Sequence, residues 1–254
     1  MSSSERRPVA NRLLRALPPA DYERVRPHLH PVEVRRGDVV IRSGEIFRHA
    51  YFPEGGLSSV LFPQVEGRRL EVGLSGREGM VSHALALGGD RTPLETLVQV
   101  GGTWLRIEAD VLRRLTTELP ALRDVLLRYV QFFLLTVSQT AVSNGAYRIE
   151  ERLARWLLIS HDRLAGDDLA LTHEFLSLML GTHRPGVTIA LHILEGAGMI
   201  RAKRGLITVL DRGKLREAAG DSYGTAEAEY ERLIGPFRAE QRPAGSMRLV
   251  PEAG

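Results

Sequence analysis

The stretch LTHEFLSLMLGTHRPGVTIALHILEGAGMIRAKRGLITVL, residues 171–210, decides the fold. It opens with Thr172, whose hydroxyl can cap a helix, and apolar residues then recur at helical spacing as far as Gly181. A second helix is expected next, with Thr182 as its cap and Pro185 in its first turn, where a missing N–H does no harm. Two short helices joined at a glycine predict a helix-turn-helix.

A basic hairpin is expected directly after the second helix. Residues 199–202 and 206–210 read as short strands on either side of Lys203, Arg204 and Gly205. A helix-turn-helix followed by a hairpin is a winged helix, in which the second helix enters the DNA major groove and the wing contacts phosphate or the minor groove. The sequence therefore predicts a DNA-binding domain.

Positive charge is concentrated in this part of the chain. Residues 182–216 contain seven basic and two acidic side chains, whereas the net charge of all 254 residues is only +3. Phosphate neutralisation requires positive charge on the element that faces the groove. A helical hairpin with ordinary solvated arginines is the alternative, which the attached basic hairpin disfavours. The residues expected to contact DNA are Thr172, Thr182, His183, Arg184, Thr188, Lys203 and Arg204.

Composition narrows the class of protein. The chain is 43% hydrophobic and 26% charged, as soluble globular proteins are. It contains no cysteine, which excludes disulfides, thiol nucleophiles and cysteine-ligated iron–sulfur clusters. No apolar run is seen to approach the ~20 residues that span a bilayer, and the first residues lack a signal-peptide core. We therefore expect a cytoplasmic protein without membrane contact.

The motifs of common enzymes are missing from the sequence. Residues 73–77, GLSGR, contain a serine but have Arg77 where a nucleophile elbow has its second glycine. There is no phosphate-cradling GxxxxGK loop and no HExxH zinc motif. His28 and His30 lie close together without a nearby third ligand, so neither a metal site nor a cofactor is expected. We predict that the protein is not an enzyme.

The chain before residue 108 follows the period-two pattern of strands. Apolar residues alternate from Val32 to Ile107, and glycines mark the turns between short runs. Many short strands predict an antiparallel, jelly-roll-like β-roll, so the expected fold is α+β, with this roll, a long dimerisation helix and a winged helix-turn-helix. The expected divisions are a leader with short helices (1–30), the roll (31–107), the hinge and long helix (108–146), the winged helix (147–220), and a short helix with a disordered tail (221–254).

The long helix expected after Pro120 is apolar on two sides, so both sides should be buried. We expect one side to cover the roll and the other to pair with a second copy, since paired winged helices bind half-sites about one DNA turn apart. A core helix of a monomer is the alternative. The predicted dimer seam consists of Leu122, Leu126, Tyr129 and Phe133. The second apolar face consists of Leu127, Val130, Leu134 and Val137.

This order of elements resembles the Crp/Fnr family of bacterial transcription regulators over about residues 13–215. The resemblance implies a homodimer that binds a near-palindromic promoter site and activates or represses transcription, with RNA polymerase as a further candidate partner. The segments that carry it are residues 36–45, 73–81, 172–181 and 194–200. The family's ligand cassette would correspond to an effector pocket containing Gly76, Glu78, Arg91 and Thr96.

Two departures from the family pattern alter what the resemblance implies. Members that bind cyclic nucleotides have an arginine that clamps the phosphate, and here Leu94 falls at that place, beside Glu95. We expect cyclic nucleotide control to be lost, unless Arg91 folds inward; a regulator that requires a cyclic nucleotide or another small molecule is the alternative. In the reading helix, Arg184 matches the family's first arginine and Ile189 replaces the second, so the operator should differ. A winged helix that binds protein is a further alternative.

Overall fold

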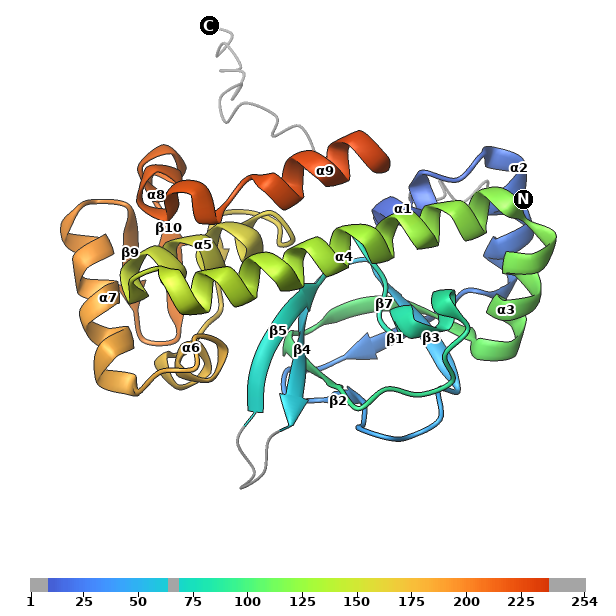
Figure 1. The fold of residues 1–254 in the computed structure, drawn as a ribbon, viewed down its shortest axis with the longest axis horizontal. Coiled ribbons are helices and arrows are strands. Elements are labelled where there is room, and N and C mark those ends of the chain that lie inside the picture. Colours follow the sequence, from blue (N-terminus) through green and yellow to red (C-terminus); the bar gives the residue numbers. More distant parts are fainter. Residues whose placement is uncertain (1–8, 64–68, 238–254) are drawn as a thin grey trace, which may run out of the picture.

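The computed structural model describes residues 9–63 and 69–237, and one long helix joins its two halves (Figure 1). This helix, α4 (Pro120–Ala146), runs along the length of the molecule, with the β-roll on one side of it. The helical, DNA-binding-like half lies at the end of the molecule where α4 ends. The predicted α+β architecture with an antiparallel roll, a long helix and a C-terminal helix-turn-helix is confirmed.

The roll is built from antiparallel sheets with the strand orders β1-β7-β3 and β2-β6-β4-β5. Phe52 and Trp104 from the first of these sheets are fully buried, and the Trp104 Nε1 donates a hydrogen bond to the Gly55 carbonyl at 3.0 Å. Gly102 is required beside this contact, because a Cβ there would lie 2.8 Å from the Gly55 backbone. The strands are β1 (His30–Val34), β2 (Val39–Ile41), β3 (His49–Pro53), β4 (Leu57–Pro63), β5 (Arg69–Ser75), β6 (Glu95–Val100) and β7 (Gly102–Glu108).

Helices cover one side of the roll. Two short helices, α1 (Arg12–Arg15) and α2 (Pro19–Val25), precede it, and α3 (Ala109–Glu118) follows β7 directly. Pro120 then lies in the first turn of α4, where its missing N–H leaves no hydrogen bond unmade. The apolar sides of α1, α3 and α4 share one core with the inner residues of the roll.

The seam predicted to meet a second copy faces the roll instead. Leu122, Leu126, Tyr129 and Phe133 are each at most 3% exposed, and they belong to the core beneath α4. The Tyr129 hydroxyl lies 3.0 Å from the Ser75 hydroxyl and donates to the Met80 carbonyl at 3.2 Å. The dimer assignment of these four residues is therefore corrected: the apolar residues that α4 leaves exposed include Leu127 and Leu134, from its other face.

Helix α4 also corrects an expectation about hydropathy. Among the described helices it is long and apolar enough to cross a membrane by length and composition, because its last 18 residues carry no charge. Of its most apolar window, 39% is buried within the chain. Core helices of soluble proteins pass the same test, and one side of α4 packs against the roll.

The second half contains the helix-turn-helix. Helix α5 (Ile149–His161) lies at its centre and is buried from Leu153 to its end at His161. The other elements are β8 (Asp168–Leu169), α6 (His173–Met179), α7 (Arg184–Gly196), β9 (Ile200–Lys203), β10 (Leu206–Val209), α8 (Arg212–Ala219) and α9 (Thr225–Leu233). The strand β8 was not expected from the sequence, and it pairs with β10 to make the wing three-stranded.

The last described segment returns to the roll. Helix α9 packs beside α4, on the side away from the strands (Figure 1). Tyr230 and Phe237 are buried there against Phe132, and the Tyr230 hydroxyl donates to the Glu78 carbonyl at 2.8 Å. The prediction of a tail disordered from Gly235 onward is therefore wrong at Phe237; the rest of that tail, residues 238–254, lies outside the described residues.

Candidate nucleic-acid interface

The turn between α6 and α7 forms for the reasons that the sequence indicates. The Thr172 hydroxyl accepts a hydrogen bond from the Phe175 backbone N–H at 3.3 Å and so caps α6. Gly181 has a φ of +57°, a conformation that favours glycine, and a Cβ there would lie 2.9 Å from Leu70 of the roll. The cap of α7 differs from the prediction, because His183 rather than Thr182 occupies that position.

Helix α7 has one buried and one open side. Its buried residues are Val187, Ala190, Leu191 and Leu194. Arg184 and His183 are exposed at its N-terminal end, as a reading helix requires of residues that reach base edges. The Thr188 hydroxyl donates to the Arg184 carbonyl at 3.1 Å and lies 3.3 Å from the His173 Nδ1. His173 was missed by sequence reasoning, because nothing in its spacing shows that it supports Thr188.

The wing presents basic residues beside α7. Strands β9 and β10 are antiparallel, with Lys203 opposite Leu206 and Gly205 at a φ of +75° in the turn. Lys203 and Arg204 are both exposed at this tip. Glu195, one of the two acidic residues in the region, accepts the Ala202 backbone N–H at 2.9 Å and so fastens the wing to α7.

Arg212 does not belong to this exposed basic surface. Its guanidinium donates to an Asp162 carboxylate oxygen at 2.7 Å and to the Tyr223 hydroxyl at 2.6 Å. It also lies 3.1 Å from the His161 Nδ1. Although the sequence counts it with the phosphate-facing charges, its contacts hold α8 against the end of α5.

The DNA-binding-like half is fastened to the roll by polar contacts. Arg36 of the roll donates to the Thr172 hydroxyl at 3.2 Å and lies over the Phe175 ring. The predicted DNA contact Thr172 is thus already engaged within the chain. Arg77 donates to the carbonyls of Arg163 and Leu164 at 3.0 and 2.9 Å, so backbone and side chains from both halves form one interface.

A buried carboxyl group lies between the two halves. Glu71 of β5 accepts the Trp156 Nε1–H of α5 at 2.8 Å and contacts Ser59 and Gln99 of the neighbouring strands. Burial raises the pKa of Glu71 to about 8, and the hydrogen bonds from Ser59 and Trp156 oppose that rise. The group is therefore largely protonated at neutral pH.

The four residues of the predicted effector pocket do not line one cavity. Thr96 lines a small cavity inside the roll. Glu78 is turned away from it: its carboxylate accepts the Arg163 Nε–H at 2.8 Å and the Gly76 backbone N–H at 3.1 Å. Arg91 is exposed and pairs with Asp90 at 3.3 Å. The resemblance to a cyclic-nucleotide cassette therefore does not extend to the arrangement of these side chains.

The cavity inside the roll is mainly apolar. Leu94, at the place where the family's phosphate-clamping arginine was expected, is among its lining residues. His83 also lines the cavity, and the centroid of its ring lies 4.2 Å from the ring centroid of Phe133 in α4. Burial lowers the pKa of His83 to about 4, so this imidazole is neutral at physiological pH. The other lining residues are Ile41, Phe47, Val60, Ser75, Val81, Ser82, Ala84, Thr92 and Thr96.

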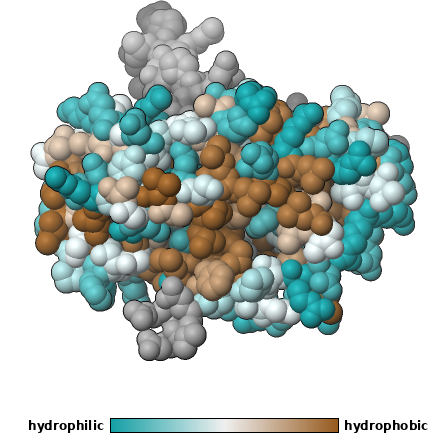
Figure 2. Space-filling view, in the orientation of Figure 1, coloured by the Kyte–Doolittle hydropathy of each residue, from teal (hydrophilic) through white to brown (hydrophobic). Residues whose placement is uncertain are grey.

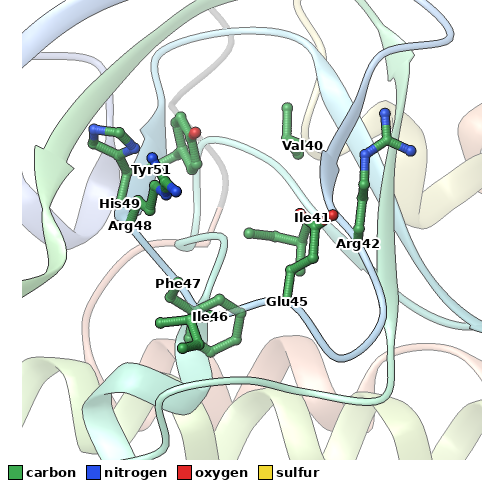
Figure 3. Close-up of a pocket in the computed structure, with 9 residues that line it drawn as sticks. All are labelled: Val40, Ile41, Arg42, Glu45, Ile46, Phe47, Arg48, His49 and Tyr51. Carbon is green, nitrogen blue, oxygen red and sulfur yellow. The ribbon is translucent and has the colours of Figure 1, made fainter.

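A second, open hollow lies on the outside of the roll, beside β2 and β3 (Figure 3). Arg42 stands on one side of it, and Arg48 and His49 stand on the other. Burial lowers the pKa of His49, and the charge of Arg106 acts in the same direction. None of the predicted site residues lines this hollow, which is lined by Val40, Ile41, Arg42, Glu45, Ile46, Phe47, Arg48, His49 and Tyr51.

Comparison with known proteins supports the reading of both halves. Residues 151–218 match the model of the Crp-like helix-turn-helix domain. The chain has the Crp/Fnr fold with a Crp-like helix-turn-helix domain. The resemblance that the sequence indicates is thereby confirmed.

Solved structures with this Crp/Fnr fold cover most of the chain at low sequence identity. FixK2 from Bradyrhizobium japonicum superimposes with a TM-score of 0.65 at 17% identity, over 76% of this chain and 98% of its own. A transcriptional regulator of the Crp/Fnr family from Eubacterium rectale gives a TM-score of 0.62 at 17% identity, over 82% and 97%. The c-di-GMP responsive global regulator CLP of Xanthomonas campestris gives 0.60 at 18% identity, over 75% and 98%. No curated protein sequence matches the chain.

Proposed function

We propose that the protein is a sequence-specific DNA-binding transcription regulator of the Crp/Fnr type. The observation that carries this proposal is the exposure of Arg184 at the start of α7, on the matched helix-turn-helix, together with the exposed basic tip of the wing that follows α7 in the chain. An arginine at the start of a reading helix can donate two parallel hydrogen bonds to the O6 and N7 atoms of guanine. Lys203 and Arg204 supply positive charge for the phosphates. A cytoplasmic location and contact with RNA polymerase are parts of the same proposal.

The proposed DNA-binding form is a homodimer that binds a near-palindromic site. Its support is the exposed apolar face of α4, which lies along the middle of the surface shown in Figure 2. Leu127 is 40% exposed and Leu134 is 56% exposed, and they are separated by seven residues, so they lie in one stripe along the helix. Two such stripes packed together would bury both leucines and set two reading helices on one face of the DNA.

DNA binding without a cyclic nucleotide is also part of the proposal. A phosphate in the roll cavity would meet Leu94 and neutral His83 rather than a guanidinium, and Arg91 points its charge to Asp90 outside. A buried phosphate without a cationic partner is strongly disfavoured.

A regulator that responds to a different small molecule is the second candidate. It is favoured by the mainly apolar cavity in the roll, because the ring of its lining residue His83 packs beside Phe133 of the helix proposed for dimerisation. A neutral molecule seated there would contact His83 and could act on α4 through it. CLP of Xanthomonas campestris, which shares the fold, is described as responsive to c-di-GMP. A ligand-dependent rise in DNA affinity would favour this second form.

The test of the first proposal is the Arg184→Ala variant. On the preferred duplex, we expect the variant to lose about 1–3 kcal/mol of binding free energy and to tolerate any base pair at one position of each half-site. Fluorescence anisotropy with the preferred duplex and with single base-pair variants measures both effects. The matched control is Arg42→Ala, which removes an exposed arginine from the roll. Equal base preferences of Arg184→Ala and the wild-type protein would contradict the assigned role.

A further inference from the structure

The open side of α7 is apolar at the place where a reading helix faces the bases. Pro185 and Ile189 are four residues apart, so their side chains lie one above the other on the same side of the helix. The buried residues Val187, Ala190 and Leu194 point in the opposite direction, into the core. Ile189 therefore projects away from the protein, and it is 60% exposed.

Ile189 is the most exposed large apolar residue on this side of α7. The Thr188 hydroxyl, its neighbour, is held by the Arg184 carbonyl and the His173 ring. Arg184 lies one turn and a half earlier, at the start of the helix. Scattered exposed apolar residues are ordinary on a protein surface, but Ile189 lies five residues after Arg184 on the side of α7 that faces away from the core, and Ile193, one turn further, is also exposed. In the proposed complex with DNA, this surface faces the floor of the major groove.

We infer that Ile189, with Pro185 beside it, packs against the 5-methyl group of a thymine in each half-site. This inference rests on the proposed function. In the major groove, the C5-methyl of thymine is the apolar group by which an A·T pair differs from the others. A branched aliphatic side chain can neither donate nor accept a hydrogen bond, so a methyl group is the feature that it can select.

The position of this thymine relative to the base read by Arg184 follows from helix geometry. Five residues of α-helix rise about 7.5 Å, at 1.5 Å per residue. Successive bases along a strand are about 3.4 Å apart. With α7 lying along the groove, Ile189 should therefore meet a thymine about two base pairs from the base read by Arg184.

The experiment replaces thymine by deoxyuridine, which differs only by the missing 5-methyl group. Each thymine of the preferred half-site is substituted in turn, and the dissociation constants of the wild-type protein and of Ile189→Ala are compared. Burial of one methyl group corresponds to about a fourfold change in affinity. We expect the wild-type protein to lose about fourfold at one thymine, and Ile189→Ala to bind the two duplexes equally well.

The matched control is Ile46→Ala, because Ile46 is 61% exposed and lies on the outside of the roll. This variant should keep the wild-type preference for thymine over deoxyuridine. A preference retained by Ile189→Ala, or absent from the wild-type protein at every position, would overturn the inference while leaving sequence-specific binding intact. A change in oligomeric state of Ile189→Ala, without a change in the thymine preference, would assign the residue to a protein contact. Failure of the wild-type protein to prefer any duplex would overturn the proposed function itself.

Discussion

At the scale of single residues, Glu71 makes the stability of the protein depend on pH. Its pKa is raised to about 8 by burial, whereas in the unfolded chain it lies near 4.5, the ordinary value for glutamate. Between these pH values the folded protein keeps a proton that the unfolded chain releases, so stability falls as pH rises through this window. The whole effect is of the order of a few kcal/mol.

The Glu71→Gln variant tests this account of pH dependence. Glutamine does not titrate, so the free energy of unfolding of the variant should fall less steeply between pH 5 and pH 8 (roughly the window between the two pKa values). Urea unfolding at several pH values measures the slope. Glu45→Gln, at an exposed position of the roll, should follow the wild-type slope. Parallel slopes for wild type and Glu71→Gln would show that the carboxyl ionises normally in the fold.

Sequence patterns indicate the local role of a residue in a cap or turn, but they do not show where a buried side chain points. Thr172, Gly181 and Pro185 act through local backbone geometry, and they have the capping, turn and first-turn positions that the sequence predicts. Glu78 was expected in an effector pocket, yet its carboxylate pairs with Arg163, 85 residues further along the chain. No local pattern contains that partner, because the contact exists only after the two halves have packed together.

At the scale of elements, α4 shows why two apolar faces cannot be told apart from sequence. Both faces have the spacing of a buried seam, and only packing against the roll decides which is covered. The face with Tyr129 and Phe133 packs against the roll, where the Tyr129 hydroxyl forms hydrogen bonds with Ser75 and Met80. The strand β8 was missed for a related reason: two residues are too few for a periodic pattern.

The exposed stripe of α4 makes a direct prediction about assembly. Leu134→Glu places a charge in the proposed dimer interface, beside its symmetry mate, and removes the burial of a leucine worth about 1.5–3 kcal/mol in each copy. We expect this variant to be a monomer by light scattering at concentrations where the wild-type protein is a dimer. The control Leu87→Glu changes a leucine that is 63% exposed in the roll and should leave the dimer intact. A dimeric Leu134→Glu would exclude this stripe as the interface.

At the scale of the whole molecule, the two halves are packed as one unit. Glu78 and Arg163, which join them, are both fully buried and 2.8 Å apart. Leu57, Leu61, Leu74 and Leu97 of the roll share a core with α5 and α7 of the other half. Tyr230 of α9 and Phe237 beyond the end of that helix belong to the core of the roll, so the chain crosses between the halves twice. The domain boundaries at residues 107, 146 and 220 therefore remain a prediction, and side chains pack together across these boundaries.

This packing bears on regulation. The half that contains α7 is held to the roll by contacts of Arg36, Arg77 and Glu78 with α6 and with the segment after α5. In a dimer formed through α4, the two copies of α7 would have a defined spacing. On the proposed function, we therefore expect the ligand-free protein to bind DNA, and this is the central claim about function.

Selection from random-sequence duplex DNA by the purified, ligand-free protein tests that claim most directly. The predicted result is enrichment of a two-fold symmetric motif whose half-sites lie about one helical turn apart. Each half-site should contain a thymine about two base pairs from the position read by Arg184. Enrichment of no motif by the ligand-free protein would contradict the claim.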